Sequence, residues 1–284
     1  MSGLSNIILE QIKNLIEKDQ LVLPTLPEVA LKAREVAEDP MVTPAKLAQV
    51  IEKDPAISVR LIKVANSPLM RTLTPATDLK SAVSRLGLNF TSNLVVGLAM
   101  EQMFHASTDI IEEKMQGVWS HCADVAGKAA VLAQRCKIPA DQALLAGLVH
   151  AIGVLPILTF IEENVPNFSD VLVLDQVAAK VSPKIGRVIL ESWDFAADMS
   201  SVPEESLNVY RHYGEEGDCA DAVLVANLIS RSDFFATVYR DVEWPKVTAF
   251  DRLDLTLVEG SNAVEEMEEL SEKFEAVSEM FKTA

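Results

Sequence analysis

Leu144-Leu145-Ala146-Gly147-Leu148-Val149-His150-Ala151-Ile152-Gly153 is an apolar run that carries one ionisable side chain, that of His150. Its length and composition predict an apolar helix that ends near Gly153. The apolar character continues to about residue 160, but His150, Gly153 and Pro156 interrupt it, so it does not predict a membrane span. We therefore expect a core helix with a single histidine near its end.

Helical spacing and helix-capping residues dominate the sequence upstream of this run. Thr43-Pro44 and Asp54-Pro55 each combine an N-cap side chain with proline at the first helical position, and Gly87 suits a helix C-cap. Strand-like alternation of polar and apolar residues is scarce. The pattern predicts helices over about residues 28–39, 44–51, 55–66, 78–87 and 89–104.

A polar stretch from His105 to Glu113 marks the expected boundary between two groups of helices. Beyond it we expect a helix from about Lys114 to Arg135, then one that Asp141 caps and that carries His150. Further helices are expected over about residues 171–180, 183–193, 204–211 and 220–230. The expected fold class is all-α, with two helical lobes over residues 1–108 and 109–258 and a C-terminal amphipathic acidic helix over residues 259–284.

The C-terminal helix has a clear pattern of its own. Asn262 and Glu265 resemble a capping box, and an apolar stripe with spacings of three and four residues follows. The stripe consists of Met267, Leu270, Phe274, Val277 and Phe281. Two interpretations stay open, because the helix either docks on the body of its own chain or forms a dimer seam. We therefore expect a monomer or a homodimer.

Charge and composition exclude several classes of protein. The 284 residues carry a formal net charge of −17, which repels a phosphate backbone, so we expect no nucleic-acid partner. Hydrophobic residues make up 49% and aromatic residues only 6%, which predicts a core of aliphatic side chains. The three cysteines form no CxxC pair and indicate reduced thiols in a cytoplasmic protein. No phosphate-binding glycine loop is present, and we expect no cofactor and no membrane attachment.

Four motifs in the first hundred residues carry a resemblance to a known family. They are Leu23-Pro24-Thr25-Leu26-Pro27-Glu28-Val29, Val50-Ile51-Glu52-Lys53-Asp54-Pro55-Ala56-Ile57, Leu61-Ile62-Lys63-Val64-Ala65-Asn66-Ser67 and Ser81-Ala82-Val83-Ser84-Arg85-Leu86-Gly87. In order and spacing they resemble the HDOD domain family, whose members are non-catalytic relatives of HD-type metal-dependent phosphohydrolases in bacterial signalling proteins. The resemblance covers about residues 21–230. It implies an N-terminal helical lobe and a C-terminal HD-phosphohydrolase-like helical bundle.

The resemblance also implies where a metal site would lie. An HD-type site uses an early histidine, an adjacent His-Asp pair, further histidines and a late aspartate. Here the early histidine corresponds to His121 and the pair to His150 and Ala151, and alanine has no atom that binds a metal. The other ligand positions correspond to Ser182, His212 and Asn227.

Both carboxylates of the HD-type site are therefore absent from this sequence. We expect a degenerate site with no catalytic residue, no metal and no enzymatic activity. For His121 and His150 two interpretations stay open, either hydrogen-bonded core histidines or loose zinc ligands. Asp124, one turn after His121, is either an orienting acid or an exposed helix acid. His212 is expected in a surface loop.

The expected function is a non-enzymatic bacterial signal-transduction or scaffold module that binds a signalling protein or a small ligand. Two alternatives stay open. One is a weak metal-dependent phosphohydrolase with a rearranged site, and the other is a nucleotide-binding sensor.

Overall fold

The structure, a computed structural model, describes residues 3–18, 20–67, 74–166, 168–212, 214–230, 236–239, 241–255 and 281. Every regular element within these ranges is helical, so the all-α prediction is confirmed. In chain order the elements are α1 Gly3–Glu17, α2 Glu28–Ala37, α3 Pro44–Ile51, α4 Pro55–Ala65, α5 Leu79–Leu86, α6 Leu88–Glu101, α7 Asp109–Ala133, α8 Ala140–Val149, η1 Ile152–Val154, α9 Leu155–Asn164, α10 Val171–Ser192, α11 Ala197–Ser200, α12 Val202–Glu205, α13 Cys219–Ile229, α14 Ala236–Tyr239, η2 Trp244–Lys246 and α15 Ala249–Arg252.

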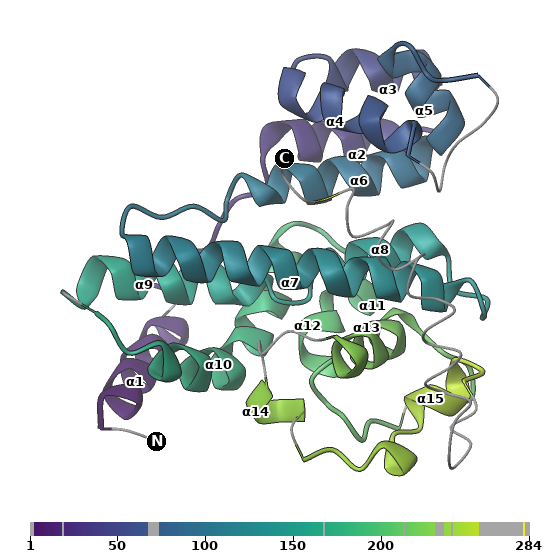
Figure 1. Cartoon of the computed structure of the whole chain (residues 1–284). Helices are drawn as coiled ribbons and strands as arrows, with labels where there is room; N and C mark the ends of the chain where they lie inside the picture. The colour runs from purple at the N-terminus through teal and green to yellow at the C-terminus, as the bar shows by residue number, and fades with distance from the viewer. Residues whose placement is uncertain are drawn as a thin grey trace.

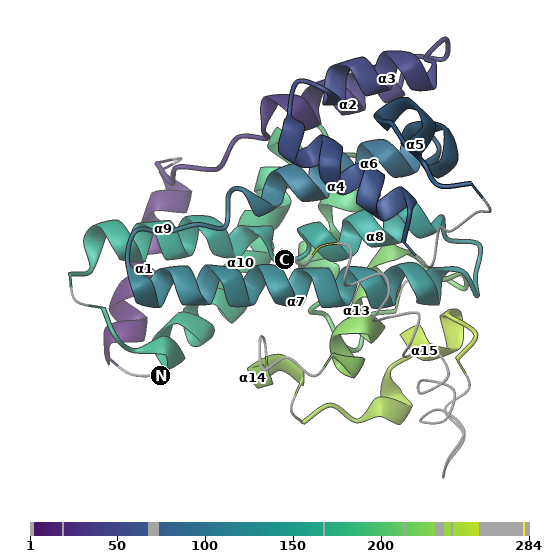
Figure 2. The same ribbon diagram turned by 45° about the horizontal axis from the view of Figure 1, so that its top comes forward.

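The helices form two groups that share α6 (Figure 1). In the first group, α2, α3, α4 and α5 pack on one another and on α6. In the second group, α8 and α13 pack on α7, while α10 packs on η1 and α12. Because α6 also packs against α8, it lies between the groups, as Figure 2 shows. A single cluster of buried apolar residues, most of them aliphatic, runs through both groups.

The first helix does not follow the expected division of the chain at residue 108. Instead of joining α2–α5, α1 packs against α10 in the second group (Figure 1). Ile8, Leu9 and Ile12 form its buried face. That apolar face needed a partner, but the local pattern of α1 does not specify which helix supplies it.

The predicted helix starts and stops of the first group are present in the structure. The side chain of Thr43 accepts a hydrogen bond from the backbone N–H of Lys46 at 3.3 Å, and that of Asp54 accepts one from Ile57 at 3.0 Å. Gly87 ends α5 with φ at +83°, in the left-handed region where a side chain is costly. These short-range signals therefore fixed the helix boundaries correctly.

Several boundaries in the second group differ from the prediction. α7 begins at Asp109 rather than near Lys114, with Thr108 as its N-cap residue. The polar stretch before it is held in place by α9. The side chain of Glu162 accepts hydrogen bonds from the backbone N–H groups of Ser107 and Thr108, each at 2.8 Å. The helix expected over residues 204–211 is the short α12, Val202–Glu205.

The helices expected over residues 171–180 and 183–193 are one helix, α10, which runs through Pro183. A proline inside a helix removes one hydrogen bond and usually breaks or kinks it. Here the buried face continues across the proline, from Val181 to Ile185, and η1 and α12 pack along it. Tertiary packing therefore holds the two halves as one element.

Two further predictions concern α8 and the C-terminus. Asp141 does not cap α8, because Pro139 is the N-cap residue and Asp141 lies in the first turn. The helix predicted over residues 259–284 lies outside the described residues, apart from Phe281. Among the described residues, Ala140–Asn164 is the one stretch long and apolar enough to cross a membrane, and 89% of its most apolar part is buried inside the fold. That stretch is core.

Candidate functional site

α8 brings His150 into the core. His150 follows the last residue of the helix, and its Nδ1 atom lies 2.6 Å from the carbonyl oxygen of Gly147. A Cβ atom at Gly147 would lie 2.4 Å from the Cα atom of Ala126 on α7. The lack of a side chain at Gly147 therefore lets α8 lie close to α7.

His121, on α7, is the residue that His150 meets. Their Nε2 atoms are 3.3 Å apart and their ring centroids 5.2 Å apart, and each residue is 3% exposed. The structure thus brings together the two histidines that the resemblance placed at one site.

The hydrogen-bond partners define the protonation of the neutral pair. Nδ1 of His150 faces a carbonyl oxygen, which only accepts, so this nitrogen carries the ring proton. Nε2 of His150 is then an acceptor, and Nε2 of His121 donates to it. Nδ1 of His121 is left as the acceptor at the other end of the pair.

Asn227, on α13, lies beside that acceptor. It is 4% exposed, and it interacts with both His121 and the phenol of Tyr239 on α14. Neither contact has the geometry of a standard hydrogen bond. Asn227 therefore lies beside the pair without a hydrogen bond of standard geometry to it, and as a neutral amide it adds no charge to the site.

Ala151 and Ser182 are both buried. Ala151 follows His150 and is 1% exposed, so its methyl group lies within the core, where the resemblance would lead one to expect a carboxylate. Ser182 is 2% exposed, and its carbonyl oxygen would lie 2.0 Å from a Cβ atom at Gly153. The backbone of α10 is thus pressed against η1.

Two other predicted site residues do not join the pair. Asp124 forms an ion pair with Lys128 and accepts a hydrogen bond from the hydroxyl of Ser230 at 2.8 Å. It therefore links α7 to the end of α13. His212 lies after α12 and is exposed.

Burial is the main electrostatic influence on both histidines. It lowers the pKa of His150 to about 4, against which the hydrogen bond to Gly147 acts weakly. Burial also holds the pKa of His121 well below its ordinary value, and His150 lowers it further. Both rings are therefore neutral near pH 7, in agreement with the hydrogen-bond pattern.

The free energy of unfolding is expected to fall as the pH falls from 6.5 to 5. The unfolded chain takes up protons on these histidines near pH 6.5, whereas folded His150 takes one up only near pH 4. Above pH 6.5 both states are neutral and the pair contributes nothing; at pH 4 the loss from His150 alone amounts to about 3 kcal/mol. Urea denaturation between pH 5 and 8 measures this dependence of the free energy of unfolding on pH.

The control is the double variant His121→Gln/His150→Gln, in which the slope of stability against pH between 6.5 and 5 is expected to shrink. Carboxylates with a lowered pKa, such as Asp218, lose their stabilising charge only below this window. An equal slope in both proteins would contradict the assignment to the pair.

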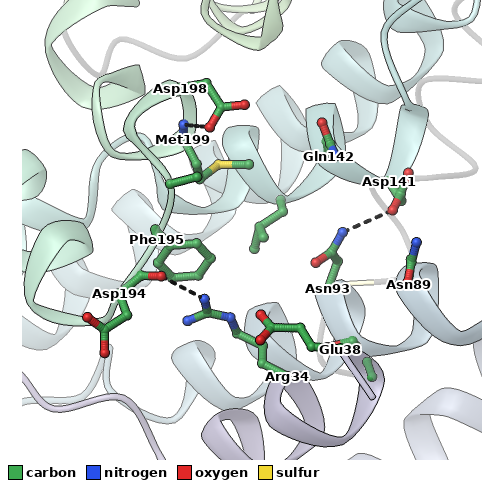
Figure 3. A pocket seen from close by; sticks show the side chains of 14 residues that line it. Arg34, Glu38, Asn89, Asn93, Asp141, Gln142, Asp194, Phe195, Asp198 and Met199 are labelled. Carbon is green, nitrogen blue, oxygen red and sulfur yellow. Dashed lines mark hydrogen bonds between the residues drawn. The ribbon is translucent and has the colours of Figure 1, made fainter. Parts of the chain in front are cut away.

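A pocket of about 360 Å³ lies between the two groups of helices. We call it the α2–α6–α8 pocket, and Figure 3 shows its lining. The residues that define it are Arg34, Glu38, Ser92, Asn93, Asp141 and Asp198. The segment after α10 closes one side of the pocket with Phe195 and Met199.

Arg34 ties α2 to that segment. Its guanidinium group donates to the carbonyl oxygens of Trp193 at 2.7 Å and Asp194 at 3.1 Å, and it lies 3.9 Å from the centre of the Phe195 ring (Figure 3). Across the pocket, the amide of Asn93 donates to Asp141 at 3.1 Å. The pocket is therefore built from contacts that join both groups of helices.

The family follows from a match over most of the chain. The model of the HDOD domain matches residues 23–207. The chain belongs to the HDOD domain family. The match includes α2 to α12, and so both the α2–α6–α8 pocket and the histidine pair of this HDOD protein.

Relatives of this HDOD protein share its overall fold. A protein of Shewanella amazonensis SB2B, whose name assigns it provisionally to the metal-dependent phosphohydrolases, is 30% identical, with a TM-score of 0.80 over 98% of this chain and 99% of that one. A protein of Marinobacter aquaeolei VT8, provisionally named for signal transduction, is 19% identical, with a TM-score of 0.56 over 98% of this chain and 66% of that one. At that identity the likeness shows the fold alone.

A curated relative is an uncharacterised protein of Treponema pallidum (strain Nichols). It is 27% identical over 209 residues, which are 67% of this chain and 37% of that protein. The HDOD chain thus spans little more than a third of the length of the curated relative it matches.

The donor atoms of this HDOD protein do not fit a resident divalent metal. The 3.3 Å between the Nε2 atoms of His121 and His150 would suit two ligands of one tetrahedral ion. However, a stable site needs three or four protein ligands, and Ala151 offers no donor and Asn227 only an amide. Within the described residues, no group of three or more His, Cys, Asp or Glu side chains is arranged to hold a metal.

Sequence reasoning missed one buried ion network. The network consists of Arg211, Arg252, Glu205, Asp218 and Asp221. Asp218 and Asp221 form the capping box that opens α13, and both also accept hydrogen bonds from Arg211, which is 4% exposed. Loss of one partner would leave a buried charge uncompensated, so we assign the network to stability.

Proposed function

We propose that this HDOD protein acts by binding a partner or small ligand rather than by catalysis, as a signal-transduction or scaffold module. The observation that carries the proposal is the His121–His150 contact, in which a neutral imidazole meets another imidazole, and no carboxylate of the described residues joins the two rings in a metal-binding group. Without a carboxylate ligand, the site can neither bind a bridging metal ion nor activate a water molecule. The provisional signal-transduction name of the Marinobacter relative agrees with this role.

The name of the Shewanella relative makes phosphoester hydrolysis the activity to test. We expect the purified protein to hydrolyse neither p-nitrophenyl phosphate nor cyclic dinucleotides in the presence of magnesium, manganese or zinc. The matched control is a His121→Ala/His150→Ala variant purified in the same way. Turnover by the wild-type protein that disappears in this variant would overturn the proposal.

A second variant tests whether one carboxylate suffices. Ala151→Asp restores the carboxylate next to His150, yet Asn227 remains an amide, so we expect no gain of turnover. Because position 151 is 1% exposed, the unpaired charge is expected to lower the free energy of unfolding by about 1–3 kcal/mol. Thermal melting with chelator and with metal monitors folding in the same samples.

A further inference from the structure

The α2–α6–α8 pocket has an excess of negative charge. Three carboxylates line it, those of Glu38, Asp141 and Asp198, against the single guanidinium group of Arg34. Asp194 also lines the pocket, but its carboxylate points away from the other side chains in Figure 3. Arg34 donates to the carbonyl oxygens of Trp193 and Asp194, and its guanidinium group lies over the ring of Phe195. Among the described residues, none of the three carboxylates forms an ion pair with a basic side chain.

A hydroxyl group in the wall of the pocket also lacks a protein partner. Ser92 lines the pocket and is 4% exposed, and within the part of the chain that the structure describes its hydroxyl makes no hydrogen bond. Its oxygen is not one of the fully buried atoms without a partner, so it is open to the pocket, where a ligand atom can bond to it. Asn89 and Asn93 lie three residues before and one residue after it on α6 and add amide groups to the same wall.

These groups select one class of ligand. A phosphate or nucleotide would be repelled by the carboxylates, which outnumber the one guanidinium group of the lining. A bare metal ion does not fit either, because the carboxylates of the described residues do not converge on one point. The volume of about 360 Å³ has room for an organic molecule.

We propose that the α2–α6–α8 pocket binds an organic cation through ammonium or guanidinium groups. The proposal deepens the binding function proposed above and rests on it. Glu38, which follows α2, and Asp141, in the first turn of α8, both line the pocket (Figure 3), and each supplies a carboxylate for a positive group. The hydroxyl of Ser92 accepts a further N–H donor.

A second pocket of about 410 Å³ adjoins the first and shares Gln142 and Asp198 with it. An elongated cation extends from one to the other past Asp198. This chemistry has two sources, a free polyamine or the basic side chains of a partner protein.

The test is isothermal titration calorimetry of the full chain with spermidine and with a short capped peptide of alternating lysine and glycine. We expect both to bind, more weakly as salt is added, and inorganic phosphate not to bind. Glu38→Gln and Asp141→Asn are each expected to weaken binding by about threefold to tenfold. Ser92→Ala leaves the charge of the pocket unchanged and is expected to weaken binding of the cation by about threefold. A peptide bound at least tenfold more tightly than spermidine would identify a protein partner as the source, and the reverse order a free polyamine.

The matched control is Glu35→Gln, which removes an exposed carboxylate from α2 without touching the pocket. Because the net charge is −17, the whole surface attracts cations, and this control separates that diffuse attraction from binding in the pocket. Equal weakening by Glu35→Gln and Glu38→Gln, or no binding of either cation, would overturn the proposal. If neither cation binds and the protein also shows no phosphoester hydrolysis, only the cation site is refuted and the proposed binding function stands. If the protein hydrolyses phosphoesters in the earlier assay, the proposed function itself is refuted.

Discussion

Replacing Gly153 with alanine is expected to lower the free energy of unfolding by about 4 kcal/mol or more, a large part of the stability of an ordinary domain. A Cβ atom at Gly153 would lie 2.0 Å from the carbonyl oxygen of Ser182 and 2.5 Å from the backbone nitrogen of Gly186. Both are atoms of the α10 backbone, so no rotamer change relieves the clash. The contact between η1 and α10 must therefore open.

Urea denaturation followed by circular dichroism measures the effect. Gly117→Ala is the matched control, because it adds the same methyl group on α7 where a Cβ atom would meet nothing within 4 Å. In the middle of a helix, that change is expected to stabilise the protein by about 0.5–1 kcal/mol. A Gly153→Ala protein as stable as the wild type would show that η1 and α10 are not in contact.

Replacing Phe281 with alanine is expected to lower the free energy of unfolding by about 3–4 kcal/mol and the melting temperature by roughly 10 °C. Phe281 is 0% exposed, and its ring meets that of Trp119 edge to face at 6.5 Å. Its carbonyl oxygen accepts hydrogen bonds from Arg60 at 3.1 Å and from the Trp119 indole at 3.4 Å. The truncation leaves a cavity beside α4, α6 and α7.

Phe281→Leu keeps most of the apolar volume and is the control, with an expected loss of about 1 kcal/mol. Scanning calorimetry of the three proteins checks the order. If Phe281→Ala and wild type melt together, the C-terminus does not dock on the body of its own chain. The dimer seam left open by the apolar stripe would then be the better interpretation of this segment.

Local signals in the sequence predicted the first group of helices well. Thr43, Asp54 and Gly87 act on residues within one turn of themselves, so the pattern contains the whole interaction. The continuous α10 was predicted wrongly for the opposite reason. Pro183 favours a break locally, and only the contacts with η1 and α12, which no local pattern contains, hold the helix together.

The site was predictable only in part. The resemblance placed His121 and His150 together, although no spacing rule relates residues on α7 and α8. Asn227 was expected at the position of a lost ligand, and the structure places its amide beside His121 without a standard hydrogen bond. The α2–α6–α8 pocket gave no sequence signal, because its walls come from segments far apart in the chain.

The position of α6 has a thermodynamic consequence for the whole chain. Since α6 supplies buried surface to α2 on one side and α8 on the other, neither group of helices keeps its core when the other unfolds. We therefore expect the described chain to unfold as one cooperative unit. A molecule bound between α2 and α8 is then expected to raise the melting temperature of both groups of helices together.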